Sequence, residues 1–317
     1  MTLETAGIHH IAAFARNPQE NVNFYAGILG LRLVKKTIDI ADTPEVYHLY
    51  FGDQSGSPGS IMAFYPWPDF RPGEVGGGQV GITTFVVPPG SFDFWEKRLN
   101  SFGIIPQKSV RFQESYLQFR DHEGLHLEIV EREDGLNSEW SFDGIPTDRA
   151  IKGFGGAVLF SMKAEKTMHV LENVLGLKKV GEDVGYARFQ SFGHIGNLID
   201  VPLENKQWGH GGAGTVHHIA WRAKDFQEHE QWFQKVSEGG YVPTHNVDRR
   251  YYNAFYFQED GHILFEIATD PPGFARDETP DALGEKLMLP EWLEPVRGKI
   301  EANLLPIEVR ALDGDKR

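Results

Sequence analysis

Two adjacent pairs of histidines are the residues in this sequence whose type and spacing most clearly suggest chemistry. His9-His10 and His217-His218 each begin a short apolar run, and Glu266 lies within a third apolar run. Two imidazoles and one carboxylate carried on strands form the donor set of a mononuclear non-haem iron site. The pattern therefore predicts a metal centre built from residues far apart in the chain.

The histidine pairs belong to a unit that occurs four times along the chain. Each copy begins with a glycine-flanked apolar strand, continues with an amphipathic helix, and closes with about three strands of alternating polarity. The four helices are predicted over residues 21–29, 92–102, 166–175 and 227–238. The unit is thus a strand, a helix and then a group of strands.

Changes in composition divide the chain into parts. A polar stretch containing proline and glycine, residues 134–152, predicts a boundary between two halves. Residues 1–135 then hold the first pair of units and residues 150–270 the second pair. The repeat stops after residue 270, so we expect residues 271–317 to form a C-terminal extension.

The four-unit arrangement resembles the vicinal-oxygen-chelate superfamily, which includes glyoxalases, bleomycin-resistance proteins and extradiol dioxygenases. The resemblance covers residues 7–269 and depends on the strand starts and on the Leu-Gly-Leu that follows the first and third helices. It implies an α+β fold in which four βαβββ modules form two paired, curled mixed sheets. It also implies that metal ligands come from the first and last strands of the units.

Only one pairing of the units supplies two histidines and a carboxylate. The first-strand position holds His10 and His218 in units one and four, and glycine in the two middle units. The last-strand position holds, in chain order, Phe64, Glu128, Asp200 and Glu266. Units one and four together give His10, His218 and Glu266 as ligands. With apolar Phe64 in the fourth place, an octahedral metal keeps three open positions, which favours oxygen chemistry over isomerase chemistry.

Each ligand histidine has a histidine directly before it. Side chains alternate along a strand, so only one member of each pair can point at the metal. The superfamily pattern selects His10 and His218. We therefore expect His9 and His217 to face the opposite side, as packing residues or as supports for the ligands.

The His-His-Ile segments and the glutamate of the final strand are similar to those of ring-cleaving dioxygenases, specifically their hydroquinone-cleaving branch. This resemblance implies Fe(II), with Mn(II) as a substitute. It also implies that Tyr256 hydrogen-bonds the substrate and that Arg249 stabilises negative charge. His217 or His245 would move a proton. Further candidates for substrate contacts are His9, Phe64 and Trp221.

Composition narrows the choice of partners. The chain has 317 residues, a formal net charge of −14 and no cysteine. The negative charge argues against nucleic acid, and no apolar stretch is long enough for a membrane span. We expect a small aromatic substrate and O2 as partners, and the sequence is compatible with a homodimer. The N-terminus lacks the pattern of a signal peptide, which predicts a cytoplasmic location.

Two alternatives remain open on the sequence. A glyoxalase-like, metal-dependent isomerase or lyase on the same scaffold would favour a fourth protein ligand. A metal-free protein that binds small aromatic molecules would need no ligand set. Metal analysis distinguishes a metal-free binding protein from a dioxygenase. Oxygen uptake distinguishes an isomerase or lyase from a dioxygenase.

Overall fold

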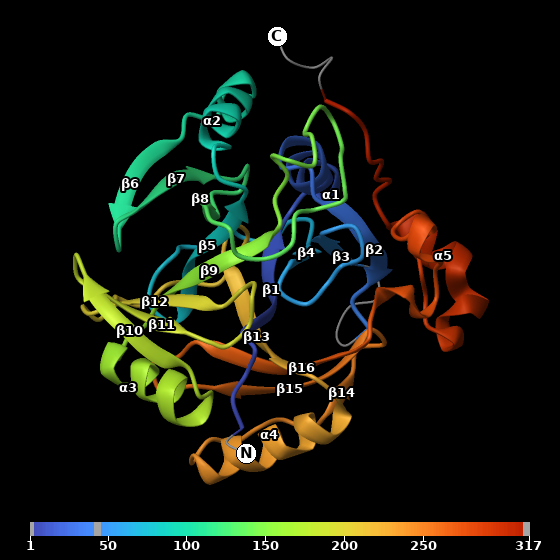
Figure 1. Ribbon diagram of the computed structural model, residues 1–317. Coiled ribbons are helices and arrows are strands. Elements are labelled where there is room, and N and C mark those ends of the chain that lie inside the picture. The colour runs from blue at the N-terminus through green and yellow to red at the C-terminus, as the bar shows by residue number, and fades with distance from the viewer. Residues whose placement is uncertain (1–2, 41–45, 313–317) are drawn as a thin grey trace.

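The structure of the protein is a computed structural model that describes residues 3–40 and 46–312. Within these residues the chain forms two eight-stranded mixed sheets, each strongly curled, with helices on the outside (Figure 1). This arrangement confirms the predicted α+β fold with two curled mixed sheets.

The first sheet combines the first and fourth units of the sequence. In sheet order its strands are β14 (Val247–Asp248), β15 (Tyr252–Gln258), β16 (Leu264–Pro272), β13 (Val216–Ala223), β1 (Ile8–Ala15), β4 (Ile61–Pro66), β3 (Tyr47–Gly52) and β2 (Arg32–Ile38). At its centre β1 and β13 pair antiparallel, while β4 and β16 flank them in parallel. First and last strands from both ends of the chain are thereby neighbours.

The second sheet combines the two middle units. In sheet order its strands are β10 (Lys178–Asp183), β11 (Tyr186–Gln190), β12 (Leu198–Pro202), β9 (Gly153–Phe160), β5 (Gln79–Val87), β8 (His126–Glu131), β7 (Glu114–Arg120) and β6 (Gln107–Arg111). Its centre repeats the arrangement of the first sheet, with β5 and β9 antiparallel. Each sheet therefore takes one unit from either side of the polar segment 134–152.

A helix follows the first strand of each unit, as predicted. The helices are α1 (Pro18–Val22) with its π-helical continuation η1 (Asn23–Ile28), α2 (Phe92–Ser101), α3 (Ala164–His169) with η2 (Val170–Val174), and α4 (Phe226–Glu238). Side-chain caps fix two of the starts: Asn17 accepts from the first backbone N–H groups of α1, and Asp225 does so for α4. Among the described residues, no helix combines the length and apolar character needed to cross a bilayer.

The C-terminal extension packs beside β2 and β3 (Figure 1). It consists of η3 (Phe274–Arg276), η4 (Pro280–Ala282), η5 (Glu291–Val296) and α5 (Arg297–Asn303). The ring of Phe274 lies 4.9 Å from that of Tyr50. The fully buried ammonium of Lys35 pairs with Asp277 at 2.6 Å and also with Glu278. The extension thus closes one side of the first sheet; residues 313–317 lie outside the described part.

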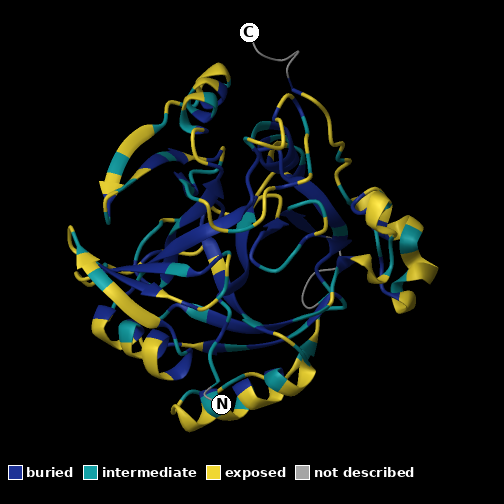
Figure 2. Cartoon of the chain, viewed as in Figure 1, coloured by how far each residue is buried: buried dark blue, intermediate teal, exposed yellow. Residues whose placement is uncertain are grey.

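Alternation along the strands gives the first sheet two different faces. We call one of them the inner face; its buried members include Ala12, Ala63, Ala220, Ala254, Ala268, Tyr50 and Tyr252. Phe64, Trp221 and Phe265, on the same strands, point the other way into the main core. Figure 2 shows that the central strands are buried, whereas exposed residues gather on the helices and on the edge strands β6 and β10. Alanines therefore make up much of the buried inner face.

Candidate metal centre

The three predicted metal ligands meet at the centre of the first sheet. His10 on β1, His218 on β13 and Glu266 on β16 are 1%, 2% and 0% exposed, and their donor atoms lie within 4.8 Å of one another. The two Nε2 atoms are 3.1 Å apart. Glu266 Oε2 lies 2.7 Å from His218 Nε2 and 3.5 Å from His10 Nε2.

These distances fit the donor atoms of one metal ion. With metal–ligand bonds of about 2.1 Å, neighbouring donors of an octahedron lie about 3.0 Å apart and opposite donors about 4.2 Å apart. The three observed distances match neighbouring donors, which is the arrangement of a facial triad. Three positions would remain for other ligands.

The electrostatics of Glu266 also indicate a cation. Both carboxylate oxygens are buried, and neither accepts a hydrogen bond of good geometry. Burial alone would raise the pKa of Glu266, but the imidazoles of His10 and His218 hold this pKa well below its usual range. Burial lowers the pKa of His218, so its imidazole stays neutral. An ionised carboxylate beside a neutral imidazole is the state that metal binding requires, and these residues could hold a metal.

His9 and His217 support the ligand imidazoles. Nδ1 of His9 lies 2.9 Å from Nδ1 of His10, and Nδ1 of His217 lies 2.8 Å from Nδ1 of His218. When Nε2 of each ligand binds a metal, its Nδ1 would carry the proton and donate it to the neighbour. Each neighbouring histidine therefore fixes the orientation and tautomer of a ligand ring.

The expectation that His9 and His217 face away from the ligands is wrong, because the strands are irregular at both residues. In the β1–β13 ladder Ile8 pairs with Trp221 and His10 with Ala220, so His9 is left out. The pairs Ala12–His218 and Ala13–Val216 leave out His217 in the same way. Each supporting histidine is thus the extra residue of a β-bulge. A bulge re-aims a side chain, which lets two consecutive histidines meet.

Phe64 and Trp221, which were predicted to contact a substrate, point into the main core and not to the inner face. Phe64 packs 4.4 Å from the ring of Tyr25 in the main core. The register explains the error: Glu266 is beside Ala220, and the corresponding neighbour of Ala12 is Ala63. The alignment that placed Phe64 opposite Glu266 is therefore off by one residue, and Ala63 occupies the fourth position.

Trp221 lies in the same core rather than on the inner face. Its ring packs edge-on to Phe265 at 5.2 Å. The neighbouring residue, Ala220, is the one that faces the ligands. Alternation along β13 turns the Trp221 side chain away from the ligands, and this position does not favour the predicted substrate contact.

The predicted arginine and tyrosine lie beside the triad. The guanidinium of Arg249 donates to the phenol oxygen of Tyr256 from Nη2 at 3.0 Å and from Nε at 3.2 Å. The Tyr256 ring is 5.4 Å from that of His218, and its residue pairs with Glu266 across the β15–β16 ladder. By contrast, His245 is exposed between α4 and β14, and no contact among the described residues joins it to the triad.

Sequence reasoning missed Tyr252 and His48, which join Tyr50 in a chain of polar aromatic residues on the inner face. The Tyr252 ring lies 5.0 Å from the His10 ring and 5.2 Å from the His9 ring. Its hydroxyl is 3.3 Å from that of Tyr50, which in turn is 2.9 Å from Nδ1 of His48. The available signal was the alternation of His48 and Tyr50 along one strand, which places both on one face.

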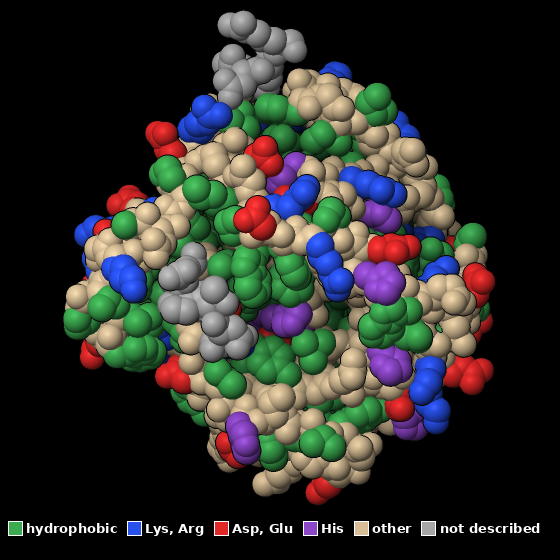
Figure 3. Space-filling model, turned by 180° about the vertical axis from the view of Figure 1, so that it is seen from behind, with side chains coloured by type: hydrophobic (Ala, Val, Ile, Leu, Met, Phe, Trp, Pro, Cys, Tyr) green, Lys and Arg blue, Asp and Glu red, His purple; other side chains and the backbone are tan. Residues whose placement is uncertain are grey.

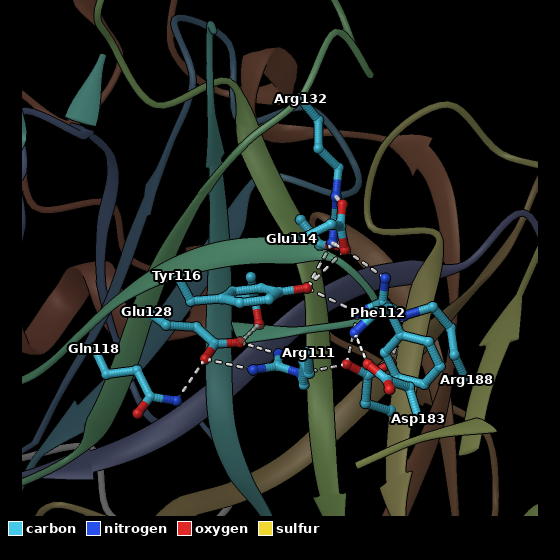
Figure 4. Close-up of polar contacts among 12 residues, drawn as sticks. Arg111, Phe112, Glu114, Tyr116, Gln118, Glu128, Arg132, Asp183 and Arg188 are labelled. Carbon is cyan, nitrogen blue, oxygen red and sulfur yellow. Dashed lines mark hydrogen bonds and ion pairs between the residues drawn. The ribbon is translucent and has the colours of Figure 1, made fainter. Parts of the chain in front are cut away.

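In the second sheet, the carboxylates at the corresponding last-strand positions bind arginine side chains (Figure 4). Arg111 donates to Glu128 at 3.0 Å and to Asp200 at 2.6 Å. Arg188 adds a bond to Asp200 at 2.7 Å. Both carboxylates are therefore neutralised within their own sheet, and Asp200 does not approach the ligands of the first sheet. The candidate metal centre belongs to units one and four.

Comparison with known proteins agrees with this geometry. The model of the Glyoxalase/Bleomycin resistance protein/Dioxygenase superfamily matches residues 7–129 and 153–275. A Bacillus subtilis protein named "Putative ring-cleaving dioxygenase MhqO" is 54% identical over 99% of this chain and 100% of its own. The chlorohydroquinone/hydroquinone 1,2-dioxygenase of Sphingobium indicum is 30% identical over 93% of this chain and 94% of its own.

Solved structures show the same fold. A crystal structure of a Bacillus subtilis protein, described as a "putative dioxygenase", superposes with a TM-score of 0.97 at 54% identity, covering 98% of this chain and 100% of that one. Glyoxalase I from Zea mays superposes with a TM-score of 0.62 at 12% identity, covering 83% of this chain and 92% of that one, which is a likeness of fold alone. The chain therefore belongs to the Glyoxalase/Bleomycin resistance protein/Dioxygenase superfamily and is a homologue of the Bacillus MhqO protein.

Proposed function

We propose that the protein is an Fe(II)-dependent dioxygenase that cleaves the ring of a hydroquinone-type aromatic diol with O2. The observation that carries this proposal is the buried set of His10, His218 and Glu266, whose spacing leaves one half of an octahedron for other ligands. A metal with three adjacent open positions can bind a substrate oxygen and dioxygen together. The names of the relatives support the same class of reaction.

Fe(II) is the metal that this donor set suits best, with Mn(II) as a substitute. A bound ion would supply a Lewis acid that lowers the pKa of a coordinated phenol and a place for dioxygen beside the ring. His9 and His217 would keep the ligand imidazoles aligned through their Nδ1 contacts. We propose that an aromatic ring would lie against the alanines of the inner face.

Tyr256 and Arg249 form a polar wall next to the triad. Because Arg249 donates twice to the phenol oxygen of Tyr256, the hydroxyl proton is free to point towards a bound ligand. Burial and the Glu266 carboxylate raise the pKa of Tyr256 well above its usual value. Tyr256 therefore stays protonated and acts as a donor to substrate oxygen, while Arg249 supplies positive charge.

His217 is better suited to donate a hydrogen bond than to accept a proton. Its Nδ1 accepts from His218, so the proton of the neutral ring lies on Nε2. Desolvation and the adjacent His218 lower the pKa of His217, although the residue retains exposed surface. We propose that His217 orients the ligand ring and presents N–H to oxygen atoms in the site. His245 has no place in this proposal.

The partners that we propose are a small aromatic diol and O2. The visible face of the molecule in Figure 3 carries Lys and Arg side chains interspersed with Asp and Glu. This mixture lacks the continuous basic stripe that nucleic acid binding uses. A homodimer and a cytoplasmic location stay predictions from the sequence.

Oxygen uptake tests the proposed function. Fe(II)-loaded protein is given methylhydroquinone or catechol, and the Glu266→Gln variant is measured beside it. Asp270→Asn is the matched control, because Asp270 lies on the same strand but pairs with Arg222 at 2.7 Å. Uptake with methylhydroquinone that is lost only in the Glu266 variant supports the proposal.

The alternatives give different results. Uptake with catechol alone would move the protein to catechol cleavage. No uptake with either diol, from protein that holds iron, would contradict the proposal and favour a metal-dependent isomerase. Protein that takes up no metal under any condition would favour a binding protein.

A further inference from the structure

His48 is a buried histidine with one unused ring nitrogen. It lies on β3 between Tyr47 and Leu49, which point into the main core, and shares the inner face with Tyr50. The residue is 5% exposed. Nδ1 contacts the Tyr50 hydroxyl at 2.9 Å, but Nε2 is shielded from solvent and has no hydrogen-bond partner among the described residues. An unsatisfied buried nitrogen destabilises a fold, so it calls for an explanation.

Two series of aromatic contacts join this imidazole to the metal centre. On one side the Tyr50 hydroxyl lies 3.3 Å from that of Tyr252, whose ring is 5.0 Å from the His10 ring. On the other side the Tyr65 ring stacks on the imidazole at 4.1 Å and lies 6.3 Å from the His217 ring. The unused nitrogen therefore borders the same interior region as the triad.

The protonation state suits a hydroxyl ligand. Burial, followed by the positive charge of Arg249, lowers the pKa of His48 well below its usual value, so the ring is neutral. A neutral imidazole has one donor and one acceptor nitrogen, and the Tyr50 hydroxyl can match either at Nδ1. Nε2 is then either a donor or an acceptor, and a ligand hydroxyl can pair with it in either role.

The position of β3 indicates which ligand hydroxyl His48 can reach. In the sheet β4 lies between β1 and β3, and the register places His48 beside Tyr65, which is level with Phe14 rather than with His10. His48 is therefore offset along the strands as well as by two strand spacings of about 10 Å in total. The two hydroxyls of an ortho-diol are adjacent, so both would be held at the metal. The second hydroxyl of a para-diol lies at the opposite end of the ring, away from the metal and towards the wall that β3 provides.

We infer that Nε2 of His48 binds the hydroxyl group of a para-diol that is remote from the metal, and so selects hydroquinones. This inference rests on the proposed function, because it assumes that the other hydroxyl occupies the triad. His48 is then a specificity residue, with Tyr50 as the positioning residue that holds its ring. Its unsatisfied nitrogen is explained as a binding group for the substrate.

Anaerobic binding of hydroquinone, phenol and catechol to Fe(II)-loaded protein, measured by titration calorimetry, tests the inference without turnover. One additional hydrogen bond predicts that the unaltered protein binds hydroquinone roughly tenfold more tightly than phenol. His48→Phe should bind both equally, through loss of hydroquinone affinity alone. His48→Gln, which keeps a polar group, should restore part of the difference. Catechol affinity should be the same in all three proteins.

His126→Phe is the matched control, because the half-buried His126 lies on β8 of the other sheet. Thermal unfolding first shows that each variant is folded. Two outcomes overturn the inference but leave the proposed function standing. In the first, both His48 variants keep the preference for hydroquinone. In the second, the unaltered protein binds phenols but shows no preference for hydroquinone. If none of the three ligands binds, both the inference and the proposed function are overturned.

Discussion

Replacement of His9 by phenylalanine should weaken metal binding without touching a ligand. His9 is 2% exposed, and its Nδ1 lies 2.9 Å from Nδ1 of His10. When His10 uses Nε2 for a metal, its Nδ1–H needs an acceptor, and His9 supplies it. Phenylalanine keeps a flat ring of similar shape but cannot accept that hydrogen bond.

The size of the effect follows from the burial of the donor. An unsatisfied buried N–H destabilises its state by about 1–3 kcal/mol. Since about 1.4 kcal/mol corresponds to a factor of ten in affinity, metal affinity should fall roughly 10- to 100-fold. Loss of a hydrogen bond that orients a ligand typically has an effect of this size.

Competition between the protein and a coloured Fe(II) chelator, under anaerobic conditions, measures this change. His9→Asn keeps an acceptor oxygen, so we expect it to bind metal within a few-fold of the unaltered protein. His169→Phe, at an exposed helical site, serves as a control. If His9→Phe binds Fe(II) as tightly as the unaltered protein, the reasoning about the bulged histidine is refuted.

Three further predictions concern the inner face and the second sheet. Ala63→Leu should lower diol affinity at least tenfold in calorimetric titrations while metal affinity is unchanged, because Ala63 takes the fourth position beside the triad. Arg111→Met should lower the free energy of unfolding in urea by about 3–5 kcal/mol, since Glu128 and Asp200 would lose the guanidinium that lies between them. Although burial opposes it, ion pairs with two arginines lower the pKa of Glu114 to about 2. Its contribution to stability should therefore be complete above about pH 4.5 and disappear as pH falls towards 2. With a side chain that is 25% exposed, that contribution is of the order of 2 kcal/mol, and Glu114→Gln should flatten the urea-unfolding profile over this pH range.

The ligand set could be predicted from the sequence because two independent patterns coincide in it. The repeat locates the first and last strand of each unit, and the histidine pairs occur only in units one and four. The shared first sheet, in which β1 and β13 are neighbours, provides the contact that this pairing requires. Residue type and repeat position were sufficient for the ligands.

The surroundings of the ligands could not be predicted in the same way. A shift of one residue moves a strand side chain to the other face, and this placed Phe64 where Ala63 stands. The bulges at His9 and His217 depend on how two distant strands pair, which no local pattern reveals. The spacing of His48 and Tyr50 could have placed both on one face, but the burial of His48 and its free nitrogen exist only once the sheet has formed.

Iron content after anaerobic reconstitution and desalting tests the central claim most directly. The claim is that one metal is held jointly by units one and four, through His10, His218 and Glu266. We predict about one iron per chain in the unaltered protein and in Asp270→Asn, and almost none in His10→Ala, His218→Ala or Glu266→Gln. Full iron content in folded His10→Ala or His218→Ala protein would contradict the claim, because it would place the metal elsewhere.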